Sequence, residues 1–169
     1  MIDNQRHIYV LLGVYNGAEY IRAQVDSIRA QTVSNWTLLV RDDGSNDGTR
    51  DVLESLTAAD ARLEIVRDED NNLGCVPNFS RLATVAFERG ARYVMFADQD
   101  DVWFPRKIEQ TLDCMLEAER RHGSRSPILV HTDLEVIDRR GSRVHASFMR
   151  FQKIRHEPRR CVVLELLGV

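Results

Sequence analysis

Two clusters of acidic residues stand out, because each follows directly on a short apolar run. The first covers residues 42 and 43, after the run 36–41, and the second covers residues 98–101, after the run 93–97. Like charges gathered so closely repel one another unless a cation lies among them. Carboxylate oxygens are the ligands that Mg²⁺ and Mn²⁺ prefer. The chemistry predicted from these residues is therefore the binding of a divalent metal together with an anionic ligand.

The second cluster has the sequence Asp98-Gln99-Asp100-Asp101. Alternate residues of a strand point to the same side, so Asp98 and Asp100 can converge on one ion. Such an ion usually takes one or two protein carboxylates and completes its shell with water and phosphate. The alternative is an acidic turn that caps the helix expected near Pro105, since Asp is a good N-cap.

The first cluster, Asp42-Asp43, is followed by Gly44. Its carboxylates could accept hydrogen bonds from a nucleobase or a sugar, because glycine lets the backbone come close to a ligand. A plain turn remains an alternative. A calcium loop from Asp43 to Glu54 is another, because acids at its positions 1, 5 and 12 and glycine at position 6 fit EF-hand spacing. An EF-hand requires a helix before the loop, however, and the run 36–41 predicts a strand.

The elements that must position these clusters alternate between strands and helices. Apolar runs rich in β-branched and aromatic residues predict strands over 7–14, 36–41, 63–66, 93–97 and 128–132. Helical spacing predicts helices over 18–31, 51–56, 77–90 and from Pro105 onwards. This alternation predicts an α/β fold with a mainly parallel sheet and helices on both faces. In such sheets ligands bind outside the carboxyl ends of the strands, where both acidic clusters lie.

The composition is that of an ordinary soluble domain of 169 residues, of which 43% are apolar and 29% charged. A formal net charge of −3 gives no general attraction to nucleic acid. Residues 139–160 nevertheless hold eight Lys or Arg and one acid, which makes this stretch +7 and the remainder −10. The basic stretch is either a solvated loop or a surface for phosphate-bearing partners or anionic lipid headgroups.

The cysteines and the N-terminus bear on where the protein works. Cys75, Cys114 and Cys161 form no paired or metal-binding spacing, which suits a reducing compartment. Neither a signal peptide nor a membrane span is visible in the sequence. We therefore expect a cytoplasmic protein.

Four motifs, taken in order, resemble the family 2 glycosyltransferases with the GT-A fold. They are Val14-Tyr15-Asn16, the run from Leu39 to Asp47, Asn72-Leu73-Gly74, and the run from Phe96 to Asp101 with Pro105. The form Asp-Gln-Asp-Asp-Val-Trp is most similar to the rhamnosyltransferase-like branch, which builds bacterial surface polysaccharides. The resemblance covers about residues 7–140. It implies inverting, metal-dependent transfer from a UDP-, dTDP- or GDP-linked sugar to a saccharide or lipid-linked acceptor.

The resemblance implies donor-binding roles for five positions. Tyr15, with Asn16 beside it, would lie against the nucleobase. Asp43, together with Asp42, would accept hydrogen bonds from that base. Asp98 would reach the ribose or the metal.

The resemblance also implies a metal site that uses Mg²⁺ or Mn²⁺. Asp100 would hold the ion that bridges the diphosphate, with Asp98 and Asp101 in support. A metal there stabilises the charge that grows on the leaving nucleoside diphosphate. In the family the general base lies well beyond this motif, so we expect it beyond Val169. Asp133 is a poor substitute.

The expected organisation is a nucleotide-sugar-binding core over residues 1–138 and, over 139–169, a basic segment with the incomplete start of an acceptor half. The apolar tail from Cys161 to Val169 looks like a cut within a larger fold. Peripheral membrane contact of the full protein, at the cytoplasmic face, stays open, with the basic segment as its only hint. A catalytically silent nucleotide-binding domain is the remaining alternative.

Overall fold

A computed structural model describes residues 6–69 and 72–154. The chain divides into two compact units, and the boundary between them along the sequence lies between Lys107 and Ile108. The first unit carries the sheet and the second carries most of one long helix and a small hairpin. The boundary expected at residue 138 stays a prediction.

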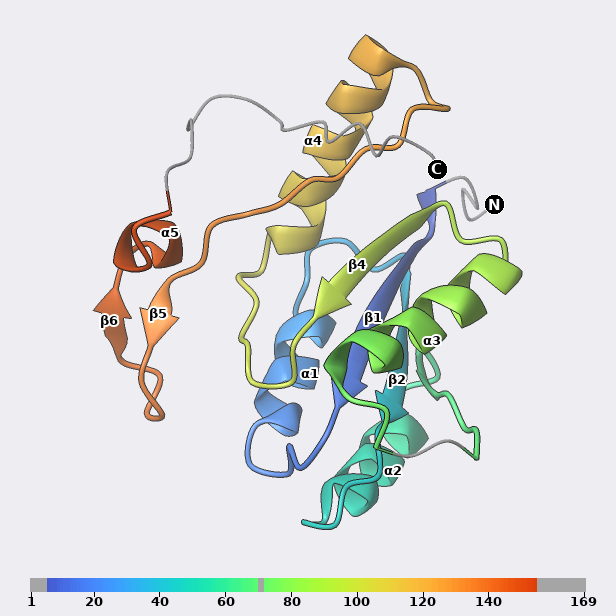
Figure 1. The fold of residues 1–169 in the computed structure, drawn as a ribbon, viewed down its shortest axis with the longest axis vertical. Helices are drawn as coiled ribbons and strands as arrows, with labels where there is room; N and C mark the ends of the chain where they lie inside the picture. The colour runs from blue at the N-terminus through green and yellow to red at the C-terminus, as the bar shows by residue number, and fades with distance from the viewer. Residues whose placement is uncertain (1–5, 70–71, 155–169) are drawn as a thin grey trace. The chain divides into compact units, whose positions relative to one another are not determined.

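The first unit alternates strictly between strands and helices (Figure 1). In chain order its elements are β1 (Ile8–Val14), α1 (Ile21–Arg29), β2 (Trp36–Asp42), α2 (Thr49–Ala59), β3 (Leu63–Ile65), α3 (Cys75–Glu88) and β4 (Tyr93–Ala97). All four strands are parallel and lie in the order β3-β2-β1-β4. The predicted α/β fold with a parallel sheet is thereby confirmed.

The strand order decides which helix covers which face. From β1 the chain moves to β2 and β3 on one side, and then crosses the whole sheet to reach β4 on the other side of β1. Because parallel crossovers are right-handed, α1 and α2 share one face and α3 takes the opposite one. Accordingly α1 contacts α2, whereas α3 packs against β1 and β2 (Figure 1). The direction of winding changes between β1 and β4, and such a switch point opens a crevice at the carboxyl ends of the two strands.

The central strands are buried on both faces, which explains their nearly continuous apolar sequences. Under α3, Leu11 of β1 and Leu39 of β2 pack with Leu82 and Ala86 of the helix. Each fully buried leucine contributes about 1.5–3 kcal/mol relative to an exposed one. This packing fixes the ends of β1 and β2 and therefore the loops that follow them.

The second unit contains the rest of α4 (Lys107–His122), the antiparallel pair β5 (Val136–Ile137) and β6 (Arg143–His145), and α5 (Phe148–Phe151). Five side chains of the basic stretch fall within the described residues, and all are exposed: Arg139, Arg140, Arg143, Arg150 and Lys153. The tail from Cys161 to Val169 lies outside the described residues. Across 6–69 and 72–154, the structure has no helix that is both long and apolar enough to cross a membrane.

One predicted strand is wrong. Residues 128–132 adopt no regular structure, and Leu129 is 46% exposed. An apolar run becomes a strand only when a neighbouring strand pairs with it, and none of the described strands pairs with this segment. The hairpin β5–β6, which the sequence analysis did not predict, follows instead.

Candidate functional site

A cavity of about 490 Å³ lies at the carboxyl ends of the strands of the first unit. Its size is typical of small-molecule sites. The residues that line it come from the ends of β1, β2 and β4 and from the start of α3: Gly13, Val14, Tyr15, Asp43, Asn72, Gly74, Cys75, Asn78, Phe79, Asp98, Gln99 and Asp100. Four of the seven predicted site residues, Tyr15, Asp43, Asp98 and Asp100, are therefore brought together around one space.

Asp43 is almost completely buried, with 3% of its surface exposed. Its Oδ1 accepts hydrogen bonds from the Leu73 N–H and from Arg41 Nη1, each at 2.9 Å, and its Oδ2 accepts one from the Gly74 N–H at 2.8 Å. Burial alone would raise the pKa of this carboxyl, but the two N–H groups and the guanidinium outweigh it, so the pKa is lowered. A carboxylate offers about four acceptor positions, so one on Oδ2 is left for a ligand.

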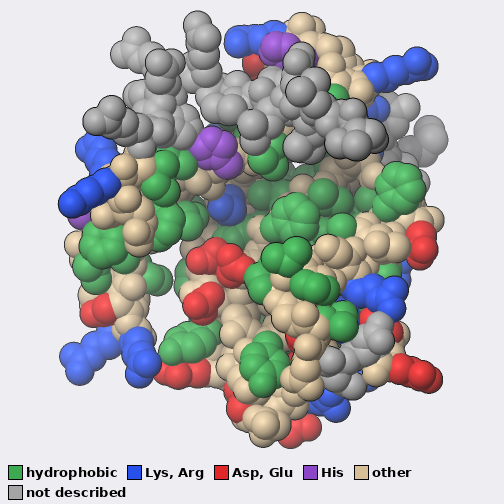
Figure 2. Space-filling view, viewed as in Figure 1, with side chains coloured by type: hydrophobic (Ala, Val, Ile, Leu, Met, Phe, Trp, Pro, Cys, Tyr) green, Lys and Arg blue, Asp and Glu red, His purple; other side chains and the backbone are tan. Residues whose placement is uncertain are grey.

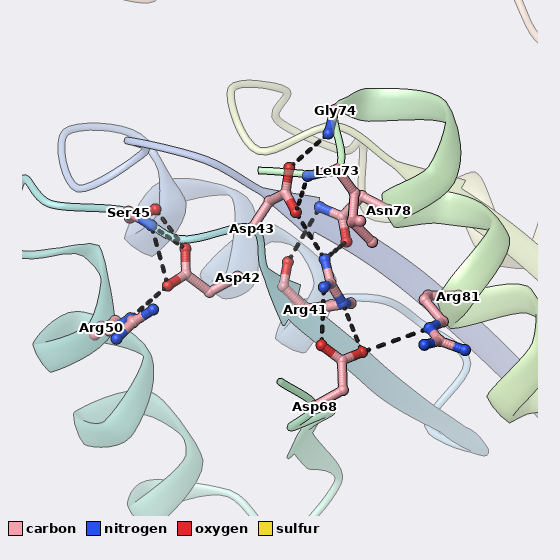
Figure 3. A network of polar contacts seen from close by, with 10 residues as sticks. All are labelled: Arg41, Asp42, Asp43, Ser45, Arg50, Asp68, Leu73, Gly74, Asn78 and Arg81. Atoms are coloured by element: carbon pink, nitrogen blue, oxygen red, sulfur yellow. Dashed lines mark hydrogen bonds and ion pairs between the residues drawn. The ribbon is translucent and has the colours of Figure 1, made fainter. Parts of the chain in front are cut away.

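Arg41 holds this arrangement from below (Figure 3). Its Nε and Nη2 donate to the two oxygens of Asp68 at 2.9 and 2.8 Å, while Nη1 also donates to Asn78 Oδ1 at 3.0 Å. The paired carboxylate of Asp68 raises the pKa of the guanidinium further above its already high value. The network ties the end of β2 to the loop before α3 and to α3 itself. The sequence analysis missed Arg41 as a site residue, although a charged residue inside the apolar run 36–41 was a visible signal.

Asp42 lies apart from the cavity, because successive strand residues point to opposite sides. Its carboxylate accepts from the Ser45 N–H at 3.1 Å and from Arg50 Nε at 2.8 Å, and it also accepts from the Ser45 hydroxyl (Figure 3). The structure thus brings Asp43, and not Asp42, to the cavity.

The loop after β1 is held by side chains from the loop after β2. The Asn16 N–H donates to Ser45 Oγ at 2.8 Å, and Asn16 Oδ1 accepts from the Asn46 N–H at 3.0 Å. Asn16, whose φ is 49°, therefore fixes the loop and does not line the cavity. Tyr15, in contrast, is 50% exposed and lies at the cavity wall, where its ring is accessible for stacking.

The calcium-loop alternative does not fit this geometry. Strand β2 stands where an EF-hand has its first helix. The acids at positions 1, 5 and 12 of the loop also have separate partners: Asp43 accepts from Arg41, Asp47 from the Thr49 N–H and hydroxyl, and Glu54 from Arg67.

The second acidic cluster lies at the end of β4. Asp98 and Asp100 are exposed and Asp101 is partly buried. Figure 2 shows acidic side chains beside the hydrophobic surface that covers α3 and β4. Among the described residues neither Asp98 nor Asp100 has a cationic partner. Although much of the Asp98 surface is exposed, the atoms around its carboxyl partly desolvate it, and this desolvation together with the Asp100 charge raises the pKa of Asp98. Burial likewise raises the pKa of Asp101, and its acidic neighbours add to this against the opposing effect of Lys107.

This donor set fits a hard divalent cation. Asp98 and Asp100 place two carboxylates along one cavity, and Mg²⁺ commonly takes no more than one or two carboxylates from a protein. Within 6–69 and 72–154 no group of three His, Cys, Asp or Glu is arranged as a metal site. The chain's own residues would therefore bind the ion only in part, and the anionic ligand and water would complete its shell.

Asp133, which the sequence indicated only as a poor substitute for the general base, has a structural role in the second unit. Its carboxylate accepts from Ser147 Oγ at 2.6 Å and from the Met149 N–H at 3.1 Å. The hydrogen bond from the Ser147 hydroxyl is the main reason that the pKa of the Asp133 carboxyl is lowered.

A parallel sheet with a cavity at its switch point is the arrangement in which α/β proteins bind small ligands. Residues 9–161 match the family described as Glycosyl transferase family 2, and the chain belongs to that family.

Curated relatives agree with this membership. The chain is 36% identical over 111 residues to the putative teichuronic acid biosynthesis glycosyltransferase TuaG of Bacillus subtilis (strain 168), covering 65% of this chain and 42% of TuaG. It is 32% identical over 110 residues to WfgD of Escherichia coli, a UDP-Glc:alpha-D-GlcNAc-diphosphoundecaprenol beta-1,3-glucosyltransferase, covering 65% of this chain and 41% of WfgD. The chain thus spans about two fifths of the length of these relatives.

Solved structures agree on the fold. S. aureus TarS 1-349 in complex with UDP superposes with a TM-score of 0.61 at 20% identity, covering 78% of this chain and 41% of TarS. The complex of the same protein with UDP-GlcNAc gives a TM-score of 0.57 at 22% identity, covering 78% of this chain and 40% of TarS. The predicted GT-A fold is confirmed.

Proposed function

We propose that this chain is the donor-binding part of a metal-dependent, inverting glycosyltransferase. The observation that carries the proposal is the convergence of Tyr15, Asp43, Asp98 and Asp100 around one cavity at the switch point of a family 2 fold. These residues supply what a nucleoside diphosphate requires, namely a ring to stack on, a buried acceptor and carboxylates that share a cation with the diphosphate.

Each residue has a part in this arrangement. The exposed ring of Tyr15 stacks on the nucleobase. The open acceptor position of Asp43 receives an N–H from the base, and the Arg41 network holds the carboxylate ready for it. Asp42 and Asn16, which lie outside the cavity, support the site by fixing the two loops around it.

Mg²⁺ or Mn²⁺ would be held by Asp98 and Asp100, with Asp101 behind them. When bound, the ion stabilises the negative charge that develops on the leaving diphosphate. These two carboxylates would hold the ion at the part of the cavity wall that they line. Asp133 is not the general base in this proposal, since its carboxylate is already engaged by the Ser147 hydroxyl.

The names of the relatives support a role in bacterial surface polysaccharide synthesis, with a saccharide or lipid-linked acceptor. The assignment to the rhamnosyltransferase-like branch rests on the sequence Asp-Gln-Asp-Asp-Val-Trp alone. Peripheral contact of the full protein with a membrane rests on the exposed basic residues between 139 and 153. The cytoplasmic location stays a prediction from the sequence.

Calorimetric titration of the chain with UDP, dTDP and GDP, each with and without Mn²⁺, tests the proposal. We expect one of the three to bind, with an affinity that rises at least about tenfold when the metal is present. The variant Asp100→Asn should lose the metal effect, whereas Asp113→Asn, the same change at an exposed position of α4, should keep it. Metal-independent binding, or no binding of any of the three nucleotides, contradicts the proposal.

A further inference from the structure

The side chain of Gln99 makes a two-point contact with the backbone of Tyr15. Its Oε1 accepts a hydrogen bond from the Tyr15 N–H at 2.8 Å, and its Nε2 donates one to the Tyr15 C=O at 3.0 Å. A neighbouring strand satisfies the backbone of its partner with the same two kinds of group. The ladder between β1 and β4 ends at the pair Leu12–Ala97. The amide of Gln99 therefore extends the pairing of these strands beyond the point where β4 itself stops.

The same contact leaves no room for a side chain at Gly17. A Cβ at Gly17 would lie 2.6 Å from Gln99 Oε1 and 2.8 Å from its Cδ, and the three nearest atoms all belong to Gln99. The backbone of Gly17 does not itself require glycine, because its φ is not positive. The absence of a side chain at this position thus serves the close approach of Gln99.

The contact spans the crevice at which the cavity lies. Tyr15 follows β1, Gln99 follows β4, and the direction of winding changes between these two strands. Gln99 lies between Asp98 and Asp100 in the sequence, so it belongs to the acidic loop after β4. Its side chain is hydrogen-bonded to the backbone of Tyr15, in the loop that holds the aromatic ring.

We propose that Gln99 is a positioning residue, which locks the Tyr15 loop to the Asp98–Asp101 loop so that ring and carboxylates face one nucleoside diphosphate at a fixed separation. This inference rests on the proposed function. Only an amide suits the position, because it donates and accepts at once. A carboxylate of the same size would face the Tyr15 C=O without a proton to offer, and would add another negative charge to the cluster.

Gly17→Ala provides a selective way to open the contact. The three atoms nearest to the added methyl group all belong to the end of the flexible Gln99 side chain. Gln99→Ala removes these three atoms, so the two substitutions should not act additively.

The contact is tested first without a ligand, by hydrogen exchange of the Tyr15 amide followed by NMR. We expect exchange to quicken about tenfold or more in Gln99→Ala and in Gly17→Ala, and no further in the double variant. The amide of Gly17, which donates to Thr49 Oγ1, is the internal control and should not change in Gln99→Ala. Unchanged exchange at Tyr15 in both single variants overturns the contact.

The positioning role is tested by UDP affinity in the presence of Mn²⁺, measured by calorimetry beside the melting temperature. Gly17→Ala should weaken binding about tenfold in the wild-type background and less than about twofold in the Gln99→Ala background, with little change in melting temperature. If Gly17→Ala lowers the UDP affinity equally in the wild-type and Gln99→Ala backgrounds, or in neither, the positioning role of Gln99 is overturned. Failure of the wild-type chain to bind UDP, dTDP or GDP overturns the proposed function and this role with it, whereas the amide exchange still decides whether the contact exists.

Discussion

The two acidic clusters follow the same kind of strand, yet they are in opposite states. Asp43 is buried and accepts hydrogen bonds from two backbone N–H groups and an arginine, which lower its pKa. Asp98 and Asp100 are exposed and lack a cationic partner among the described residues, and the pKa of Asp98 is raised. Among residues 6–69 and 72–154, Asp43 thus has three hydrogen-bond donors, one of them a guanidinium, whereas Asp98 and Asp100 have no cationic partner.

This difference separates recognition from metal binding. A carboxylate that is fixed by three donors presents its remaining acceptor position in a set direction, as selection of a base requires. Carboxylates that repel one another gain most from a cation, and they lose nothing within the fold when they rearrange around it. Substitutions that alter either the hydrogen-bonded Asp43 or the exposed Asp98 test this difference directly.

The largest expected effect is the loss of the Arg41 guanidinium. Arg41→Met leaves Asp43 and Asp68 without their shared partner inside the fold, which should cost about 3–5 kcal/mol of unfolding free energy in a chemical denaturation experiment. Arg50→Met removes an ion pair with Asp42 whose arginine side chain is 62% exposed, and it should cost less than about 1 kcal/mol. Equal losses in the two variants would contradict the buried, strongly stabilised state of Asp43 that sets it apart from the exposed carboxylates.

A smaller effect is expected for Asp43 itself, and it should depend on pH. Asp43→Asn should lower the unfolding free energy at pH 7 by about 1–3 kcal/mol, because the guanidinium loses its charged acceptor. The folded-state pKa lies below the usual 3.8, so the stabilisation is fully present above that value and is lost as the pH falls through the folded-state pKa. The difference between wild type and variant should therefore shrink below about pH 4. A difference that stays constant from pH 7 to pH 3 would show that the charge is not what stabilises this site.

The smallest effect, and one of opposite sign, is expected at Asp98. Without metal at pH 7, Asp98→Asn should leave the melting temperature unchanged or raise it slightly, because burial and Asp100 both disfavour the charge at this position. Asp113→Asn on α4 is the matched control and should not change the melting temperature. A clear decrease in Asp98→Asn alone would mean that the fold already compensates this carboxylate.

The sequence was sufficient for the architecture of the first unit, because its strands are short apolar runs and its helices have clear periodicity. It failed at 128–132, where an apolar run has no neighbouring strand among the described residues. Whether such a run forms a strand depends on a partner, which its own residues do not encode.

The candidate site was predicted only in part, for a different reason. The carboxylates after β2 and β4 could be found because alternation of strand and loop places them at one edge. The roles of Arg41 and Gln99 could not be predicted, because they depend on contacts between segments that lie 27 and 84 residues apart in the sequence. Asp42 and Asp43 are neighbours with the same side chain, and only the direction of each side chain separates the cavity residue from the loop residue.

A crystal structure of the chain with Mn²⁺ and UDP would decide, through the anomalous signal of the metal, whether the carboxylates after β4 bind the ion. We expect manganese bound between the diphosphate and the carboxylate of Asp100, with Asp43 still bound to Arg41 and facing the base. Manganese bound at Asp43 or Asp47, or a diphosphate whose ion does not contact residues 98–101, would contradict it.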